Sequence, residues 1–223
     1  MGAGGGVILL MFMSLWMPPV AVIPVHGMVQ LGSNTGRASM TWKHIHWPTI
    51  GWFLPGVLLG IIVGGVLLVR LPEPVWQTII AVFVLYLCWG PPLPKRAVGA
   101  RGIVVVGAVT SFIGLFVGAS GPLVAAYIKQ VHHQRFTAVA TFSFAMVLQH
   151  APKAVVFAFT GFYFLEWLPL IVGMIATGAL GTWIGLKLLG NQTDRRFKQL
   201  FNMLLTLLAL RLLWMSGQGF GLF

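Results

Sequence analysis

Acidic residues are scarce in this chain. Only 3 of its 223 residues are Asp or Glu, and these residues, Glu73, Glu166 and Asp194, all fall in segments that connect apolar runs. A carrier of metal ions or other cations is expected to hold carboxylates at its binding site inside the membrane. The lack of acids within the apolar runs argues against such a carrier and makes an anion the simpler substrate.

Groups for catalysis and metal binding are also missing. The only cysteine, Cys88, lies in an apolar run and cannot form an internal disulfide. His132 and His133 have no Cys, Asp or Glu beside them at the spacing of metal ligands. Within the apolar runs there is no His/Asp/Glu set and no nucleophile paired with a base. We therefore expect no catalytic residue, no metal site and no cofactor.

Apolar sequence is what the chain has in abundance. It is 58% hydrophobic and 8% charged, with a mean hydropathy of +0.92, which predicts an all-α polytopic membrane protein. The formal net charge is +11, but the basic residues are scattered at the ends of apolar runs and form no stripe. The positive-inside rule explains this pattern better than nucleic-acid binding does. No cleavable signal peptide is visible, so we expect the helices themselves to direct membrane insertion.

Two glycine-rich stretches interrupt apolar sequence where a membrane helix should continue. One contains Gly118, Ser120, Gly121 and Pro122, and the other is residues 2–6. Glycine supports a helix poorly, and proline lacks a backbone N–H and clashes with the preceding turn. A break at membrane depth is tolerated only where protein or a water-filled cavity satisfies the open backbone. Paired breaks in two halves of a chain are the best sequence indication of a transporter binding site.

The chain repeats its plan, which predicts two repeats at residues 1–97 and 98–223. A Gly/Pro-rich segment at 90–96 separates them. Pairs 116 residues apart are Gly2 with Gly118, Gly5 with Gly121 and Arg37 with Lys153, and pairs 117 apart are Gly56 with Gly173, Gly64 with Gly181 and Arg70 with Lys187. The two breaks, two intramembrane cations and two small-residue faces thus fall into register.

Each repeat is predicted to be a broken-helix hairpin followed by three transmembrane helices. The first has a short run at 7–17 and helices at 20–42, 50–69 and 75–89; the second has arms at 103–117 and 123–130 and helices at 136–161, 167–189 and 197–214. The first hairpin lacks its leading arm, so either the chain begins late or that arm is dispensable. Glycines at 56, 60 and 64, and at 173, 181 and 185, are expected to form packing seams.

Charge predicts the orientation. If residues 103–130 enter and return on one side, nearly all basic loops share that side and only Arg70 lies opposite. A complete crossing would divide them almost evenly, which the positive-inside rule disfavours. The basic residues on the shared side are Lys43, Lys95, Arg96, Arg101, Lys129, Arg135, Lys187, Arg195, Arg196 and Lys198. The hairpin makes the repeats inverted and turns both termini away from the cytoplasm.

Arg37 and Lys153 are the strongest candidates for anion binding. A cation in the middle of a membrane helix costs about 2.5–3.5 kcal/mol on insertion scales, so it usually faces the protein interior. Either cation could instead snorkel to a headgroup or bond the carbonyls of a broken helix. The half-helix N-termini that follow Gly6 and Pro122 would add backbone N–H groups and positive dipole ends to an anion site.

Polar neighbours could complete the site. Ser33 and Asn34 precede Arg37 by one helical turn, and Gln149 and His150 precede Lys153 in the same way. Alternatively, Gln149 and His150 only join helices by hydrogen bonds. His26 is interpreted as a packing residue. The predicted substrate-binding residues are Gly2, Gly4, Gly5, Gly6, Gly118, Ser120, Gly121 and Pro122 in the breaks, and Ser33, Asn34, Arg37, Gln149, His150 and Lys153 on the helices.

The two breaks resemble those of the TauE/SafE sulfite exporter family. That family has a Gly-x-Gly-Gly-Gly stretch before an apolar run, matched at residues 2–6, and a Gly-Pro version before an apolar run ending in Tyr, matched from Gly118 through Pro122 to Tyr127. Ser120 stands where many members have glycine, and the leading helix arm of the first half is absent. The resemblance covers essentially the whole chain and implies transport of sulfite or organosulfonates across the cytoplasmic membrane.

Two classes of function remain open from sequence. An anion transporter would place both breaks around a polar cavity, whereas a non-transporting membrane scaffold or assembly factor would bury them against apolar side chains. A membrane enzyme is the third and weakest possibility. The direction of transport, the coupling ion, the particular anion and the oligomeric state are not indicated by the sequence.

Overall fold

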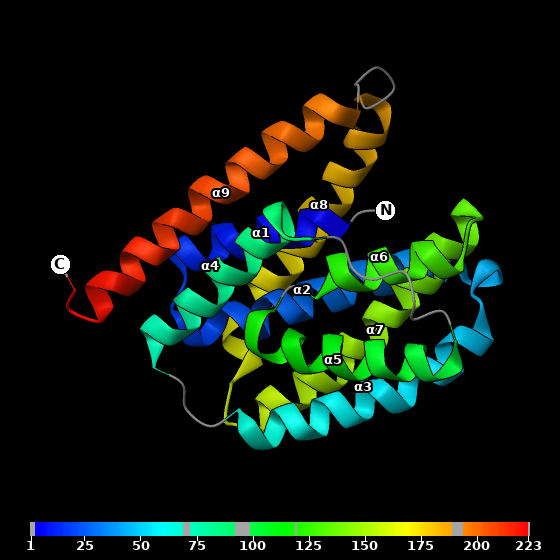
Figure 1. The fold of residues 1–223 in the computed structure, drawn as a ribbon, viewed down its shortest axis with the longest axis horizontal. Coiled ribbons are helices and arrows are strands. Elements are labelled where there is room, and N and C mark those ends of the chain that lie inside the picture. The colour runs from blue at the N-terminus through cyan, green and yellow to red at the C-terminus, as the bar shows by residue number, and fades with distance from the viewer. Residues whose placement is uncertain (1–2, 69–71, 92–98, 119, 189–193, 223) are drawn as a thin grey trace.

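The structure is a computed structural model that describes residues 3–68, 72–91, 99–118, 120–188 and 194–222 (Figure 1). These residues form helices and connecting turns, with no strand among them. The first half contains α1 (Ala3–Trp16), α2 (Pro19–Met40), α3 (Trp47–Leu67) and α4 (Glu73–Trp89), with a 3-10 turn, η1, at Trp42–His44. The predicted all-α polytopic architecture is therefore confirmed.

The second half begins with the predicted broken helix. Its elements are α5 (Ala100–Val117), α6 (Gly121–Val131), α7 (Arg135–Phe159), the 3-10 turn η2 (Phe164–Trp167), α8 (Leu168–Leu188) and α9 (Asp194–Gly219). In the described part of the chain, four helices are long and apolar enough to cross a membrane: α3, α5, α7, and α8 together with η2. The helix α5 thus has the length of a span by itself, although the sequence predicts it as one arm of a hairpin.

Backbone chemistry explains the break between α5 and α6. Gly118 ends α5 with φ at +80°, a left-handed conformation that glycine adopts without steric cost. Its N–H donates to the Gly114 carbonyl at 3.1 Å. Pro122 then stands at the start of α6, where its missing N–H has no helical partner to lose. In Figure 1 the chain reverses here, and α6 doubles back beside α5, as the sequence predicts for a hairpin.

Close packing at glycines joins α3 to α5. A Cβ atom on Gly56 or Gly60 would overlap the backbone carbonyls of Val104 and Ala108. This confirms the packing seam predicted for α3. The equivalent prediction for α8 is wrong within the described residues, because a Cβ on Gly173 or Gly181 would have no atom within 4 Å. The side chains around Gly185 lie outside what the structure describes.

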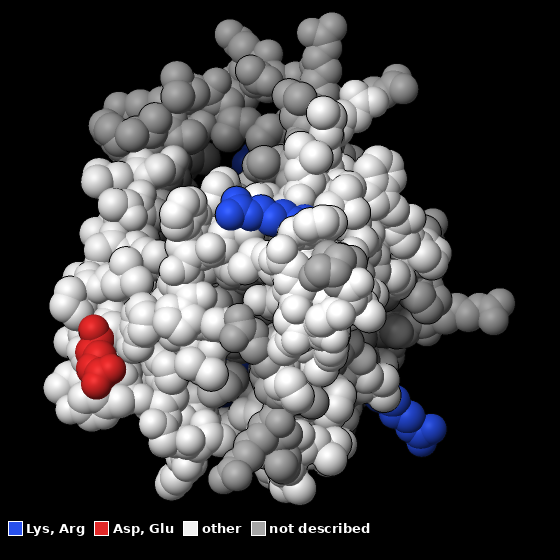
Figure 2. Space-filling model, turned by 90° about the vertical axis from the view of Figure 1, so that its left-hand side faces the viewer, with Lys and Arg blue, Asp and Glu red and all other residues white. Residues whose placement is uncertain are grey.

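The core of the bundle lies where α2 and α7 pack side by side. Both helices also contact further elements: α3 packs on α7, α8 on α2, and α6 on α7. The helices α4 and α9 pack on each other, and between them Thr78 Oγ1 and Ser216 Oγ lie 2.6 Å apart. Figure 2 shows one end of the molecule, where few of the described side chains carry charge. The α2–α7 contact positions the candidate site.

Candidate functional site

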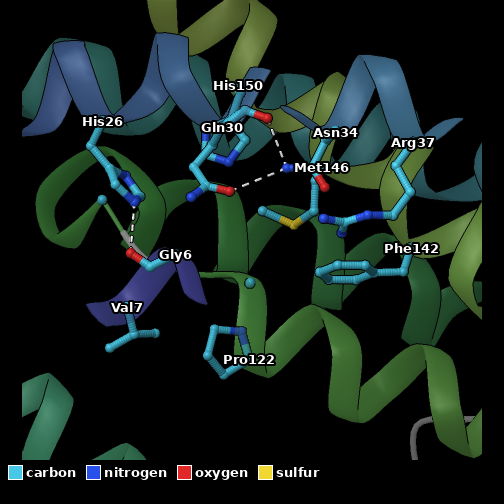
Figure 3. A pocket seen from close by; sticks show the side chains of 12 residues that line it. Gly6, Val7, His26, Gln30, Asn34, Arg37, Pro122, Phe142, Met146 and His150 are labelled. Atoms are coloured by element: carbon cyan, nitrogen blue, oxygen red, sulfur yellow. Dashed lines mark hydrogen bonds between the residues drawn. The ribbon is translucent and has the colours of Figure 1, made fainter. Parts of the chain in front are cut away.

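The two glycine breaks face one pocket. Gly6 of α1 lines it together with Gly118, Gly121 and Pro122 of the second break, which comes more than a hundred residues later in the chain (Figure 3). The pocket has about 330 Å³ of empty space, including the open solvent at its mouth. The described parts of the two breaks therefore lie at one pocket, which is the placement expected for a transporter. Gly2, which the sequence also predicts here, lies outside them.

One wall of the pocket is polar and comes from α2. Its side chains are His26, Gln30, Asn34 and Arg37, which are spaced so that they share one helix face. In Figure 3 Arg37 points into the pocket, toward Phe142. No Asp or Glu is among the described residues that line the pocket. Arg37 therefore gives the wall a positive charge with no carboxylate in the described lining to balance it.

Hydrogen bonds fix two of the polar side chains. His26 Nε2 lies 2.8 Å from the carbonyl oxygen of Gly6, and because a carbonyl only accepts, Nε2 carries the proton. Asn34 Nδ2 donates to the Gln30 carbonyl at 2.8 Å and to Gln30 Oε1 at 3.3 Å. The oxygen of Asn34 and Nδ1 of His26 are buried without a hydrogen-bond partner among the described atoms. Buried polar atoms without partners are costly. Both atoms are acceptors, so they could bind a guest only through a donor group on it.

The opposite wall comes from α7 and is mainly apolar. Phe142 and Met146 line it, with His150 one turn further along. The His150 ring is 2% exposed, and neither of its nitrogens has a hydrogen-bond partner among the described residues. Its centroid lies 6.4 Å from that of His26, at an interplanar angle of 74°. The pocket thus combines one charged wall, one apolar wall and two histidine rings between them.

The lining follows the sequence repeat. Adding 116 to His26, Gln30 and Asn34 gives Phe142, Met146 and His150, and adding it to Gly6 gives Pro122; all eight residues line the pocket. This is the arrangement expected when a pocket lies on the axis that relates two repeats.

Lys153 lies behind the pocket wall. It is 3% exposed and is not among the lining residues, and its Nζ donates to the Gly114 carbonyl at 3.4 Å. A Cβ on Gly27 of α2 would lie 2.9 Å from Lys153 Cε and 3.9 Å from His150 Nδ1, so both side chains flank the same glycine. This contact with a carbonyl of the broken helix favours the structural alternative considered for Lys153.

Gln149 connects the break to its neighbours. Its Oε1 accepts from Ser120 Oγ at 2.9 Å, and its Nε2 donates to Thr110 Oγ1 at 2.7 Å and to Ser111 Oγ at 2.9 Å. Both polar ends of Gln149 are therefore used within the protein. Gln149 and Ser120 are buried outside the pocket lining, which favours the alternative role of joining helices.

The remaining predicted residues lie elsewhere. Ser33 and Gly5 are not in the described lining of the pocket, and Gly4 lines a second, more apolar pocket between α1, α4 and α9. Sequence reasoning missed Gln30 as a lining residue and assigned His26 to packing. The spacing of these two residues along one face with Asn34 and Arg37 is a signal that could have identified them.

Within the described residues, no group of three or more His, Cys, Asp or Glu side chains could hold a metal ion. The described pocket lining provides cationic, amide and imidazole groups with an apolar wall. This combination suits a small anion. Broken helices that face a polar cavity inside an apolar bundle define a membrane transport protein as a class.

Comparison with known families gives the same class. The family model described as "Sulfite exporter TauE/SafE" matches residues 1–212, so the chain belongs to the TauE/SafE sulfite exporter family. No curated protein and no solved structure matches the chain.

Proposed function

We propose that this protein moves small sulfur-containing anions, such as sulfite or organosulfonates, across the cytoplasmic membrane through the pocket between its two breaks. The observation that carries the proposal is the pocket itself: Gly6 and Gly118 meet at a cavity lined by Arg37, with no acid in its described lining. A scaffold would have no need for a polar cavity at its breaks. Membership of a transporter family supports the same conclusion.

Arg37 is the group proposed to neutralise the anion. Its guanidinium can donate two parallel hydrogen bonds to an oxyanion. Gln30 lies on the same wall and can add amide N–H groups from its Nε2, whereas Asn34 Nδ2 already donates to Gln30. At the start of α6 the Gly121 N–H has no partner inside the helix and can add one backbone donor, whereas Pro122 has no N–H and those of Leu123 and Val124 donate to the Ser120 carbonyl. Phe142 and Met146 would contact an organic substituent if the guest carries one.

The test is flux of radiolabelled sulfite and of methanesulfonate into proteoliposomes. A hydrogen bond to a charged group is worth about 1.5–3 kcal/mol, so Arg37→Met should reduce affinity by about 10- to 100-fold. Arg37→Lys should keep part of the activity because the charge remains. Arg211→Met, on the exposed face of α9 and outside the pocket, is the matched control and should transport like the wild type. Equal flux in Arg37→Met and Arg211→Met would contradict the role of Arg37.

A further inference from the structure

His150 is the buried group that the anion-binding role of the pocket does not explain. Its ring lines the pocket, is 2% exposed, and leaves both nitrogens without a hydrogen-bond partner among the described residues. A buried imidazole normally satisfies at least one nitrogen, because an unpaired polar atom in an apolar interior costs free energy. The His150 ring is therefore in place to exchange a proton or a hydrogen bond with whatever enters the pocket.

The described titratable groups around His150 are all basic. On its own helix, α7, Lys153 follows one turn later and flanks the same glycine, Gly27. On α2, His26 lies with its ring centroid 6.4 Å away, and Arg37 lines the same pocket. No acidic side chain balances these groups in the described lining. A proton added to His150 in the empty pocket would therefore meet positive charge with no described counter-ion.

The other elements around α7 add no charge to the pocket. Helices α1, α5 and α6 bring glycines, Val7 and Pro122 to the described lining, and α3 has no titratable side chain. Tyr127 of α6 is buried, but it is not in the lining. His44 of η1 lies beside Phe136, near the N-terminal end of α7 and away from the pocket. The only described groups that can oppose or accept a proton at the pocket are thus those on α2 and α7.

We propose that the pocket binds one proton together with each anion, and that His150 is the residue that takes the proton. A bound anion supplies the negative charge that the pocket lacks and an oxygen that can accept from the protonated ring. Anion and proton then favour each other's binding, and this coupling is reciprocal. A singly charged anion and one proton together add no net charge to the pocket. A pH gradient can therefore drive transport of the pair. This inference rests on the proposed function.

The experiment uses proteoliposomes of the intact protein, labelled sulfite as the probe, and a membrane potential held at zero with potassium and valinomycin. Uptake into protein-free liposomes is subtracted. Downhill exchange is measured first at equal pH on both sides, and accumulation is then measured with the outside about one pH unit more acidic. With one proton per anion, that gradient supports about tenfold accumulation. Absence of downhill exchange in the wild type would contradict the proposed function itself and is distinguishable from every result below.

The deciding variant is His150→Gln, which keeps hydrogen-bonding groups but cannot take the proton. We expect the tenfold accumulation to fall to about onefold, measured at a sulfite concentration at which the variant still gives detectable downhill exchange. His150→Asn provides a second variant if the first fails to give a monodisperse protein. His132→Gln removes a titratable ring outside the pocket and should accumulate sulfite as the wild type does.

Three results would overturn the proposal. The first is downhill exchange by the wild type without accumulation in the gradient. The second is accumulation by the variant, which would place the proton on sulfite or on another group. The third is loss of downhill exchange by the folded variant, which would make His150 an anion-binding group and not the site of the proton.

Discussion

Arg37 and Lys153 are equivalent by the sequence repeat, yet the structure places them in different surroundings. Arg37 lines the pocket, whereas Lys153 is buried behind it and donates to the Gly114 carbonyl. That carbonyl also accepts from the N–H of Gly118, so it stays bonded whether or not the lysine is present. We conclude that Arg37 is the residue placed to contact a guest, while Lys153 is a buried basic group next to His150.

A separate pair of histidines joins two loops at one end of the bundle. Thr49 Oγ1 lies 2.9 Å from His46 Nδ1 and 2.9 Å from His132 Nε2, and the two rings are 4.6 Å apart. His46 also begins α3 by accepting from the Thr49 N–H. Burial, and then the neighbouring His46 and His133, lower the pKa of His132 from its ordinary value. This cluster should make stability depend on pH.

The prediction at His132 concerns acid. Because its pKa is lower in the folded protein, the unfolded chain binds more protons below about pH 6.5. The contribution of neutral His132 to stability is therefore complete above that pH and is lost as the pH falls through the pKa of the folded state. In thermal unfolding of detergent-purified protein between about pH 8 and pH 5, His132→Gln should lose less stability on acidification than the wild type. Parallel curves for the two proteins would contradict this expectation.

The sequence predicts part of the candidate site and misses another part. Glycines and Pro122 mark the breaks because nothing else explains them inside apolar sequence. Asn34, Arg37 and His150 are predicted and line the pocket. Gln149 is predicted too but faces α5 and α6, because adjacent helical residues point about 100° apart. Sequence alone cannot say which of two neighbouring polar residues faces the cavity.

At the scale of elements, helix ends are predictable and helix partners are not. Pro18, Gly90 and Gly118 end apolar runs, so the observed helices begin and end near the predicted positions. The glycine patterns of α3 and α8 look alike in sequence, but only the one on α3 packs against another described helix. A small-residue face permits close approach but does not specify the helix that approaches.

This difference gives a matched pair of substitutions. Gly60→Ala places a Cβ against the Ala108 carbonyl and should destabilise the protein by about 1–3 kcal/mol, because backbone cannot move aside as a flexible side chain can. Gly173→Ala on α8 has no described atom within 4 Å of the new Cβ and should be neutral or slightly stabilising. The measurement is the thermal midpoint of the purified variants in detergent. A similar loss of stability in both variants would show that the α3–α5 contact does not cause the destabilisation by Gly60→Ala.

At the scale of the whole molecule, the contacts pair equivalent elements. The repeat relates α1 to α6, α2 to α7, α3 to α8 and α4 to α9. In the structure α1 packs on α6, α2 on α7 and α4 on α9, and the contact of α3 with α7 is matched by that of α8 with α2. His26, in the first half of α2, lies beside His150, in the second half of α7. The backbone N–H of His46, which follows α2, donates to Thr141 in the first half of α7. The helices α2 and α7 therefore run antiparallel. These contacts support our proposal of two inverted repeats, with residues 1–97 forming one and 98–223 the other.

The loops provide the last test of this architecture. His46 and Thr49 contact Thr141 and His132, so the loop that carries Lys43 and the loop before α7 lie at the same end of the bundle. In Figure 1 the start of α5 and the end of α6 also lie at this end. The basic residues that this brings together are Lys43, Arg101, Lys129 and Arg135, whereas η2 and its Glu166 lie at the opposite end. Lys95, Arg96 and Arg70 are outside the described residues.

By the positive-inside rule, the end with Lys43 and Arg135 should face the cytoplasm. In a Cys88→Ser background, a new cysteine at exposed His133 should react with a membrane-impermeant maleimide only after the cells are permeabilised. A cysteine at Tyr163, which is 61% exposed at the opposite end, should react in intact cells. Labelling of both positions from one side would contradict a membrane crossing by α7, on which the inverted repeat depends. Labelling with the two sides exchanged would keep the repeat but reverse the orientation assigned from charge.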